Sequence, residues 1–186
     1  MVGSAPWLAL FVVLTLVVAL IGVRAEGASL RSLGFRGLSW WATPLVALAL
    51  ALFFIFVFGP LANWFLSATH LLGFSGGAAT LARLPTWYLA LDVVIVAAAE
   101  EWLYRAYAIE RLQAITGSAG AAAALSLAAF GLAHLPLWGP GVALTTLVSG
   151  GVLTALYVWR RDITALVLAH VATDLYGLVI APLLSR

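Results

Sequence analysis

The chain has 186 residues, of which 65% are hydrophobic and only 9% are charged. A soluble domain is about 45–50% apolar and about 25% charged, so this composition excludes a soluble globular fold and predicts a protein whose solvent is lipid. The net charge of +2 is too small to indicate nucleic-acid binding, and the lack of cysteine excludes disulfides, thiolate catalysis and cysteine-based metal sites.

Transmembrane helices need about 20 mainly apolar residues. Six segments meet this requirement, at about 7–23, 44–69, 86–115, 118–135, 142–159 and 163–184. The sequence therefore predicts an all-α polytopic membrane bundle of about six transmembrane helices. We expect one integral membrane domain over residues 1–186, with a motif-bearing core at about 86–180. No Lys or Arg precedes the first segment, so we expect a retained span rather than a signal peptide.

Helix-breaking residues predict where these segments bend or end. Gly59-Pro60 predicts a kink in the second segment, because proline removes a helical hydrogen bond and clashes with the preceding turn. Residues 73–85 are expected to form a loop, Gly117 to end the third segment, and Trp138-Gly139-Pro140-Gly141 to form a tight turn. Asp162 follows two arginines and is expected to cap the last helix.

Arginine in short connectors marks the cytoplasmic side of a membrane protein. Six arginines lie in the first, third and fifth connectors: Arg24, Arg31, Arg36, Arg111, Arg160 and Arg161. Only Arg83 and Arg186 lie on the other side, so we expect both termini outside the cytoplasm. Nine arginines without a lysine suggest a GC-rich genome, and hence a bacterial plasma membrane.

The third segment carries two adjacent carboxylates at membrane depth, where an ionisable residue needs a partner or a function. Glu101 and Arg105 are one helical turn apart and can form an ion pair. Glu100 then points about 100° away and can face a cavity. Arg105 can thus hold one carboxylate as the anion and leave the other for proton transfer. A purely structural ion network would use the same residues.

Histidines occur in the fourth and sixth segments. Phe130 and His134 are four residues apart and share a helix face, as do His170 and Asp174. Asp174 can fix a histidine tautomer, bind a metal or bind substrate. Taken alone, each motif also fits a structural role, as a histidine bonded to a backbone carbonyl or as a polar pair that bridges two helices.

Glu100, His134 and His170 can converge from three segments on one point. A carboxylate that takes a proton from water and two imidazoles that bind a developing oxyanion form a minimal hydrolytic site. The same three residues form a plausible zinc shell, and spacing alone does not choose between the two. Because the histidines lack the His-Glu-x-x-His spacing, we expect no cofactor, with zinc left open.

Depth in the membrane presents one difficulty for a shared site. At about 1.5 Å per residue, Glu100 lies about 22 Å from the predicted cytoplasmic end of its helix at Ile115. His170 lies only about 12 Å from Arg161, at the start of the last helix. We therefore expect the last helix to be tilted or to begin earlier.

The three motifs, in this order, resemble those of the CPBP family of intramembrane proteases. This family includes the CaaX prenyl endopeptidases and the bacterial bacteriocin-processing and self-immunity (Abi) proteins. Its pattern of EExxxR, FxxxH and HxxxN or HxxxD is similar to Glu100-Glu101…Arg105, Phe130…His134 and His170…Asp174. The flanking residues Ser32–Phe35 and Ser149–Tyr157 are also similar, so the resemblance covers about residues 30–180.

This resemblance implies a role for each motif residue. Glu100 would activate water with the help of His134, without a metal, and His170 and Asp174 would stabilise the oxyanion. The supporting residues would be Glu101, Arg105 and Phe130. Asp174 departs from the Asn of many members, since an ionised Asp cannot donate a hydrogen bond. Six helices are also fewer than the eight of CaaX endopeptidases.

We therefore predict an intramembrane endopeptidase whose partners are the lipid bilayer and a membrane-associated peptide or protein substrate. The alternative is a non-proteolytic immunity or scaffold protein of the same fold, in which the polar residues are structural. A third interpretation is a proton or ion pathway. That function needs polar residues along the whole path, and the outer halves of these segments offer few.

Overall fold

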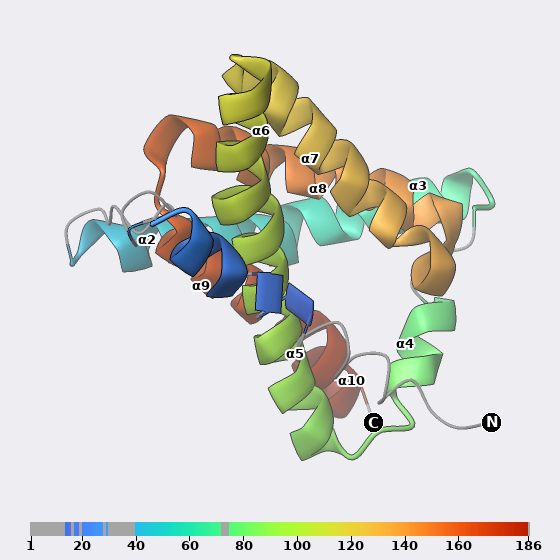
Figure 1. The fold of residues 1–186 in the computed structure, drawn as a ribbon. Helices are drawn as coiled ribbons and strands as arrows, with labels where there is room; N and C mark the ends of the chain where they lie inside the picture. Colours follow the sequence, from blue (N-terminus) through green and yellow to red (C-terminus); the bar gives the residue numbers. More distant parts are fainter. Residues whose placement is uncertain are drawn as a thin grey trace.

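The computed structural model describes residues 14, 15, 17, 18, 20–27, 29, 40–71 and 75–185, and this part of the chain contains helices and no strand (Figure 1). Three described helices are long and apolar enough to cross a membrane: Ala42–Ala68, Leu135–Arg160 and Ile163–Leu184. The predicted all-helical class is thus confirmed, while the number of six spans stays a prediction. The first predicted span and the Ser32–Phe35 connector lie largely outside the described residues.

The third predicted segment forms one continuous helix, which stands upright in Figure 1. It consists of α5 (Thr86–Glu100), the π-helical segment η3 (Glu101–Ile109) and α6 (Glu110–Thr116). Gly117 ends it as predicted, because its φ of 69° lies in the left-handed region that glycine adopts without steric cost. The helix interior carries charged residues, so its composition is less apolar than that of the three candidate spans.

Helices α7 (Ala119–Ala133) and α8 (Leu135–Arg160) follow. The Ser118 hydroxyl accepts a hydrogen bond from the Ala121 amide and so caps the start of α7. The predicted four-residue turn at Trp138 is wrong in extent. Only Gly139 leaves helical geometry, with φ 79° and ψ 175°, and the helix resumes at Pro140, whose missing amide proton is tolerated in a first turn.

The second predicted segment comprises α2 (Ala42–Phe53), the π-helical η2 (Phe54–Phe58) and α3 (Gly59–Ala68). Gly59 has helical angles of −57° and −52°, and a π-helical turn precedes Pro60. Because helices bend at prolines and at π-bulges, the kink predicted here stays a prediction. The loop predicted at 73–85 is wrong in part. It contains the short helix α4 (Ser75–Leu81), which forms although two of its seven residues are glycine, a poor helix former.

The last segment comprises α9 (Ile163–Leu175), η4 (Tyr176–Ile180) and α10 (Ala181–Leu184). Asp162 caps it as predicted, because its carboxylate accepts hydrogen bonds from the amides of Thr164 (3.1 Å) and Ala165 (3.2 Å). The same carboxylate accepts a 2.8 Å hydrogen bond from the Thr43 hydroxyl, which ties the start of α9 to α2.

Two apolar cores lie along the upright helix, on either side of its acidic pair. The larger core gathers side chains from η3 and from α7, α8, α9 and η2, and includes Ile109, Tyr157 and Leu166. The smaller core joins Leu89 and Val93 of α5 to Val179 of η4. Glu100 and Glu101 lie between Val93 and Ile109 in the chain, so the fold places both carboxylates in the layer between the two cores.

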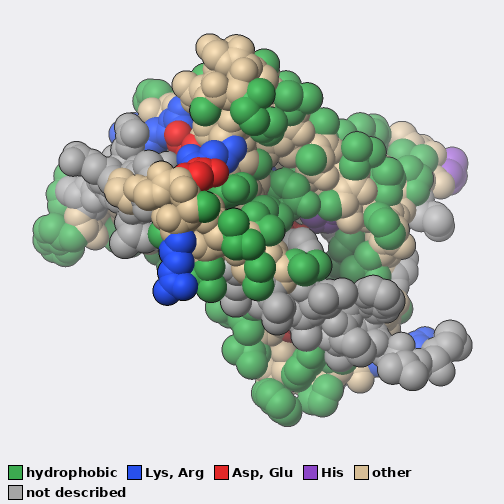
Figure 2. All heavy atoms as spheres, viewed as in Figure 1, with side chains coloured by type: hydrophobic (Ala, Val, Ile, Leu, Met, Phe, Trp, Pro, Cys, Tyr) green, Lys and Arg blue, Asp and Glu red, His purple; other side chains and the backbone are tan. Residues whose placement is uncertain are grey.

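A polar network joins the three connectors that the arginine pattern places in the cytoplasm. Glu26 of the first connector pairs with Arg111, and Glu110 pairs with Arg161 of the fifth connector. The Tyr157 hydroxyl also donates to Glu110, at 2.9 Å. Figure 2 shows acidic and basic atoms gathered beside α6, with hydrophobic side chains next to them. The ends of these segments therefore lie together.

Candidate functional site

Glu101 and Arg105 form the predicted ion pair and are almost completely buried. Arg105 Nη1 lies 2.9 Å from Glu101 Oε1, and the two side chains are 1% and 0% exposed. The second guanidinium nitrogen, Nη2, donates to the Gly150 carbonyl of α8 at 3.4 Å. The guanidinium also lies over the Phe130 ring, 4.0 Å from its centroid, which is a cation–π contact. Phe130 thus supports the charged pair from α7.

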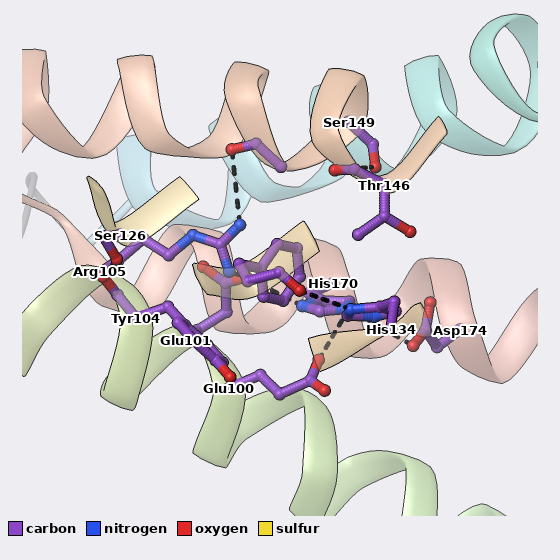
Figure 3. Close-up of polar contacts among 12 residues, drawn as sticks. Glu100, Glu101, Tyr104, Arg105, Ser126, His134, Thr146, Ser149, His170 and Asp174 are labelled. Atoms are coloured by element: carbon purple, nitrogen blue, oxygen red, sulfur yellow. Dashed lines mark hydrogen bonds and ion pairs between the residues drawn. The ribbon is translucent and has the colours of Figure 1, made fainter. Parts of the chain in front are cut away.

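His170 joins α9 to both carboxylates of the upright helix. Its Nδ1 lies 2.9 Å from Glu101 Oε1, the oxygen that also accepts from Arg105. Its Nε2 lies 3.4 Å from Asp174 Oδ2 and 4.0 Å from Glu100 Oε2. Figure 3 shows the ring between these carboxylates. Because Nδ1 donates to Glu101, the ring is fixed in orientation and presents Nε2 to Glu100.

Glu100 remains partly accessible, unlike Glu101. Its side chain is 16% exposed, and within the described part of the chain it has no hydrogen bond, only the 4.0 Å approach to His170. Figure 3 shows its carboxylate pointing toward the histidine rings. The predicted pairing of one carboxylate with arginine is therefore confirmed, while the role of its neighbour in a site stays a prediction. The neighbouring Asp174 is the most open member of the site, at 39% exposure.

His134 enters the site from the end of α7. Its Nδ1 lies 2.8 Å from the Phe130 carbonyl oxygen. Because a carbonyl oxygen only accepts, Nδ1 carries the proton and Nε2 is left for the site. The ring contacts the Phe130 ring edge-on, with centroids 4.7 Å apart. His134 also lies within electrostatic range of Glu100. Both histidines thus use Nδ1 as an anchor.

The depth difference expected from the sequence disappears when depth is counted from the polar network. Glu110 and Arg161 form an ion pair, so they lie in one layer. Glu100 is ten residues from Glu110, at most about 15 Å because the intervening segment is π-helical and rises less per residue than an α-helix, and His170 is eight residues from Asp162, or about 12 Å. Counted from this ion pair, Glu100 and His170 therefore lie at similar depths. The tilt or earlier start expected for the last helix stays a prediction.

Two residues near the site were not predicted from the sequence. Gly150 accepts a hydrogen bond from Arg105, and a Cβ atom at this position would lie 2.9 Å from the Phe130 ring. Small residues mark close helix contacts in membranes, so the Gly150-Gly151 pair was a usable indication. Ser126 donates to the Tyr104 carbonyl and links α7 to η3. No sequence pattern distinguishes Ser126 from other serines in apolar helices.

Among the described residues, no three His, Cys, Asp or Glu side chains are placed so that they could hold a metal ion. Glu100, His134 and His170 in particular do not form a three-ligand shell of the kind that binds zinc. The expectation of no cofactor stays a prediction.

The motifs lie inside a region that matches a known protein family. Residues 82–176 match the family model described as type II CAAX prenyl endopeptidase Rce1-like, so the match covers about half of the chain and contains all three motifs. No curated protein and no solved structure matches the chain.

Proposed function

Because the chain belongs to the Rce1-like family of type II CAAX prenyl endopeptidases, we propose that it is an intramembrane endopeptidase that hydrolyses peptide bonds of membrane-associated peptides or proteins. The observation that carries this proposal is the approach of Glu100 to His170 within a buried charge network. One carboxylate is held by arginine, and the other is left free to accept a proton.

Glu100 is the general base of the proposed reaction. Its carboxylate is partly exposed and unpaired at hydrogen-bond distance, so a water molecule can bind beside it and lose a proton to it. His134 assists, because its Nδ1 is bonded to the Phe130 carbonyl and its Nε2 can accept a hydrogen bond from the same water. The resulting hydroxide attacks the carbonyl carbon of the scissile peptide bond.

His170 stabilises the negative charge that develops on the carbonyl oxygen. Its two ring nitrogens lie against the carboxylates of Glu101 and Asp174, which favour proton donors at both positions. Asp174 then acts as an acceptor that orients and charges the ring, rather than as a donor to substrate. This role suits an aspartate at a position where many family members carry asparagine.

The membrane orientation is part of the proposal. The polar network of Glu26, Glu110, Arg111 and Arg161 supports a common cytoplasmic side for the first, third and fifth connectors. With six spans, both termini then face outward. The site lies about 12–15 Å from this network, near the middle of a hydrocarbon core about 30 Å thick. Its substrates would therefore approach from within the bilayer.

The test is cleavage by purified protein in liposomes, with a farnesylated CaaX peptide and a set of single-span peptides as probes. We expect wild-type protein to cut at least one probe. Glu100→Ala, His134→Ala and His170→Ala should each lower kcat by about 10²–10⁴-fold, because each removes an acid–base or electrostatic group. His70→Ala is the matched control, since His70 is an exposed histidine outside the site.

Three full-activity alanine variants would contradict the proposal and leave the immunity or scaffold alternative. In the same assay, we expect a chelator such as EDTA to leave kcat unchanged, because the described side chains offer no three-ligand metal shell. Loss of activity in EDTA with recovery on zinc addition would overturn the metal-free part of the proposal.

A further inference from the structure

One hydroxyl on α8 faces the site without a partner in the described part of the chain. Figure 3 shows the Thr146 side chain pointing toward the histidine rings and Asp174. Its neighbours differ, because the Thr145 hydroxyl donates to the Val142 carbonyl at 2.9 Å and the Ser149 hydroxyl donates to the Thr146 carbonyl at 3.3 Å. The Thr146 hydroxyl makes no such bond, so its proton is available to a molecule in the site.

The register of α7 and α8 places Thr146 opposite His134. The junction between these helices runs from His134 to the break at Gly139. Beyond it α8 packs against α7 in the opposite direction, since Leu147 lies against Gly131 and Leu127 against Gly151. A Cβ atom on Gly150 would lie 2.9 Å from the Phe130 ring, which sets Gly150 against Phe130. One turn nearer the junction on each helix, the facing residues are Thr146 and His134. The hydroxyl therefore lies in the layer that holds the proposed base and its assisting histidine.

The proposed reaction needs more donors than the motif residues offer. Oxyanions are stabilised by donors aimed at the oxygen. Nδ1 of His134 and Nδ1 of His170 are already bonded to Phe130 and Glu101. Nε2 of His170 faces two carboxylates, and an ionised Asp174 donates nothing.

We propose that the Thr146 hydroxyl donates a hydrogen bond to the oxyanion of the tetrahedral intermediate, and so supplies the donor that asparagine would offer in place of Asp174. This inference rests on the proposed endopeptidase function. As water attacks, its oxygen bonds to the carbonyl carbon, its proton passes to Glu100 and the carbonyl electron pair moves to oxygen. When the C–N bond breaks, the proton on Glu100 passes to the leaving amine. Thr146 keeps its own proton throughout.

The first test compares Thr146→Val, which removes the hydroxyl at nearly constant volume, with Thr146→Ser, which keeps it. Removal of one oxyanion donor lowers kcat by about 10²–10³-fold, so we expect this loss in Thr146→Val with KM nearly unchanged. Thr146→Ser should retain most of the activity toward the farnesylated CaaX peptide. Thr145→Val is the matched control, because its hydroxyl is bonded within its own helix. Equal kcat values for Thr146→Val and wild type would overturn the inference while leaving the proposed function intact.

The second test measures binding and does not depend on turnover. The probe is the farnesylated peptide with a phosphinate in place of the scissile amide, which imitates the tetrahedral oxyanion. Thr146→Val should bind the phosphinate at least about tenfold more weakly than wild type does. Binding of the uncleaved amide peptide is measured in the Glu100→Gln background. Adding Thr146→Val to Glu100→Gln should leave the affinity for this amide peptide unchanged. Equal weakening for both ligands would show a merely structural role and overturn the inference. A wild-type protein that neither cuts the peptide nor binds the phosphinate would overturn the inference and the proposed function together.

Discussion

Glu101 concentrates the charge interactions of the site on a single carboxylate oxygen. Oε1 accepts from Arg105 and from His170, both at 2.9 Å, and the Glu101 side chain is fully buried. The second oxygen, Oε2, is buried without a hydrogen-bond partner among the described residues. Such a residue holds its neighbours in place, and because it is fully buried it does not contact a substrate.

Removal of one partner from this buried pair should therefore cost more than removal of both. Breaking a buried ion pair costs about 3–5 kcal/mol, whereas apolar replacement of both partners is often close to neutral. We expect Arg105→Met to lower the free energy of unfolding by about this amount, and Glu101→Leu combined with Arg105→Met to recover much of it. Unfolding in mixed detergent micelles measures both.

The double variant should remain inactive although it regains stability, because His170 has lost the acceptor for Nδ1. A fully active double variant would show that Glu101 does not position His170. Arg105→Met with wild-type stability would show that the charge network carries no folding energy.

At the residue scale, the sequence was sufficient where the contact is local. Helical periodicity accounts for the pairing of Glu101 with Arg105 and for the different direction in which Glu100 points. The bond from His170 to Glu101 joins residues 69 positions apart, so no helical spacing indicates it. Thr146 was missed for the same reason, since its position depends on the register of two helices. The catalytic roles of the motif residues stay predictions.

Helices α7 and α8 approach closely because glycine occupies the contact. A Cβ atom on Gly150 would lie 2.9 Å from the Phe130 ring and 3.0 Å from Arg105 Nη2. On Gly151, the nearest atom would be Leu127 Cδ2 at 3.6 Å, an ordinary contact. Two adjacent glycines in one helix thus differ in whether a methyl group fits.

We expect Gly150→Ala to reduce the free energy of unfolding by about 1–3 kcal/mol, the usual cost of an overpacked core. It should also lower kcat, because the added methyl group displaces Phe130 and Arg105 beside the site. Gly151→Ala is the control and should be neutral or slightly stabilising, since alanine is the better helix former by about 1 kcal/mol. The prediction fails if the two variants have the same stability and the same kcat.

Helix ends marked by short-range chemistry were predicted well. The cap at Asp162 and the stop at Gly117 both depend on residues within one turn. The short helix α4 was missed because its glycines suggested a loop. The π-helical segment before Pro60 was not predicted, because proline indicates a missing hydrogen bond and does not indicate how the helix adapts.

At the scale of the whole molecule, the polar network gives the bundle one charged end. Arg111 and Glu110 on the third segment pair with groups from the first and fifth connectors. His70 lies at the far end of α3, which the arginine pattern places on the opposite side of the membrane. The exposed residues Ile115 and His70 can therefore report the two sides.

The absence of native cysteine permits a direct test of this orientation. In intact spheroplasts, we expect a membrane-impermeant maleimide to label His70→Cys and not Ile115→Cys. Permeabilisation should allow both to react, which controls for accessibility. Labelling of Ile115→Cys in intact cells would reverse the proposed topology, although it would leave the geometry of the site unchanged.

Composition was enough to predict a helical membrane protein, since a chain with 65% hydrophobic residues has too little polar surface for water. The number of spans is harder to predict, because a helix that carries buried charges is less apolar than its neighbours. The segment from Thr86 to Thr116 shows this conflict between charged residues and an apolar solvent.

The nine-residue π-helical segment η3 begins at Glu101 and ends immediately before Glu110. Each π-type bond reaches one residue further than an α-type bond, so residues beyond the segment face other directions than they would in a regular α-helix. One helix can thereby direct its buried acids at one set of neighbours and its charged tip at another. Gain or loss of a single residue in this segment would change the direction of the charged end at Glu110, while Glu100 and Glu101 keep theirs. The chemistry of the protein and its anchoring can therefore diverge separately during evolution.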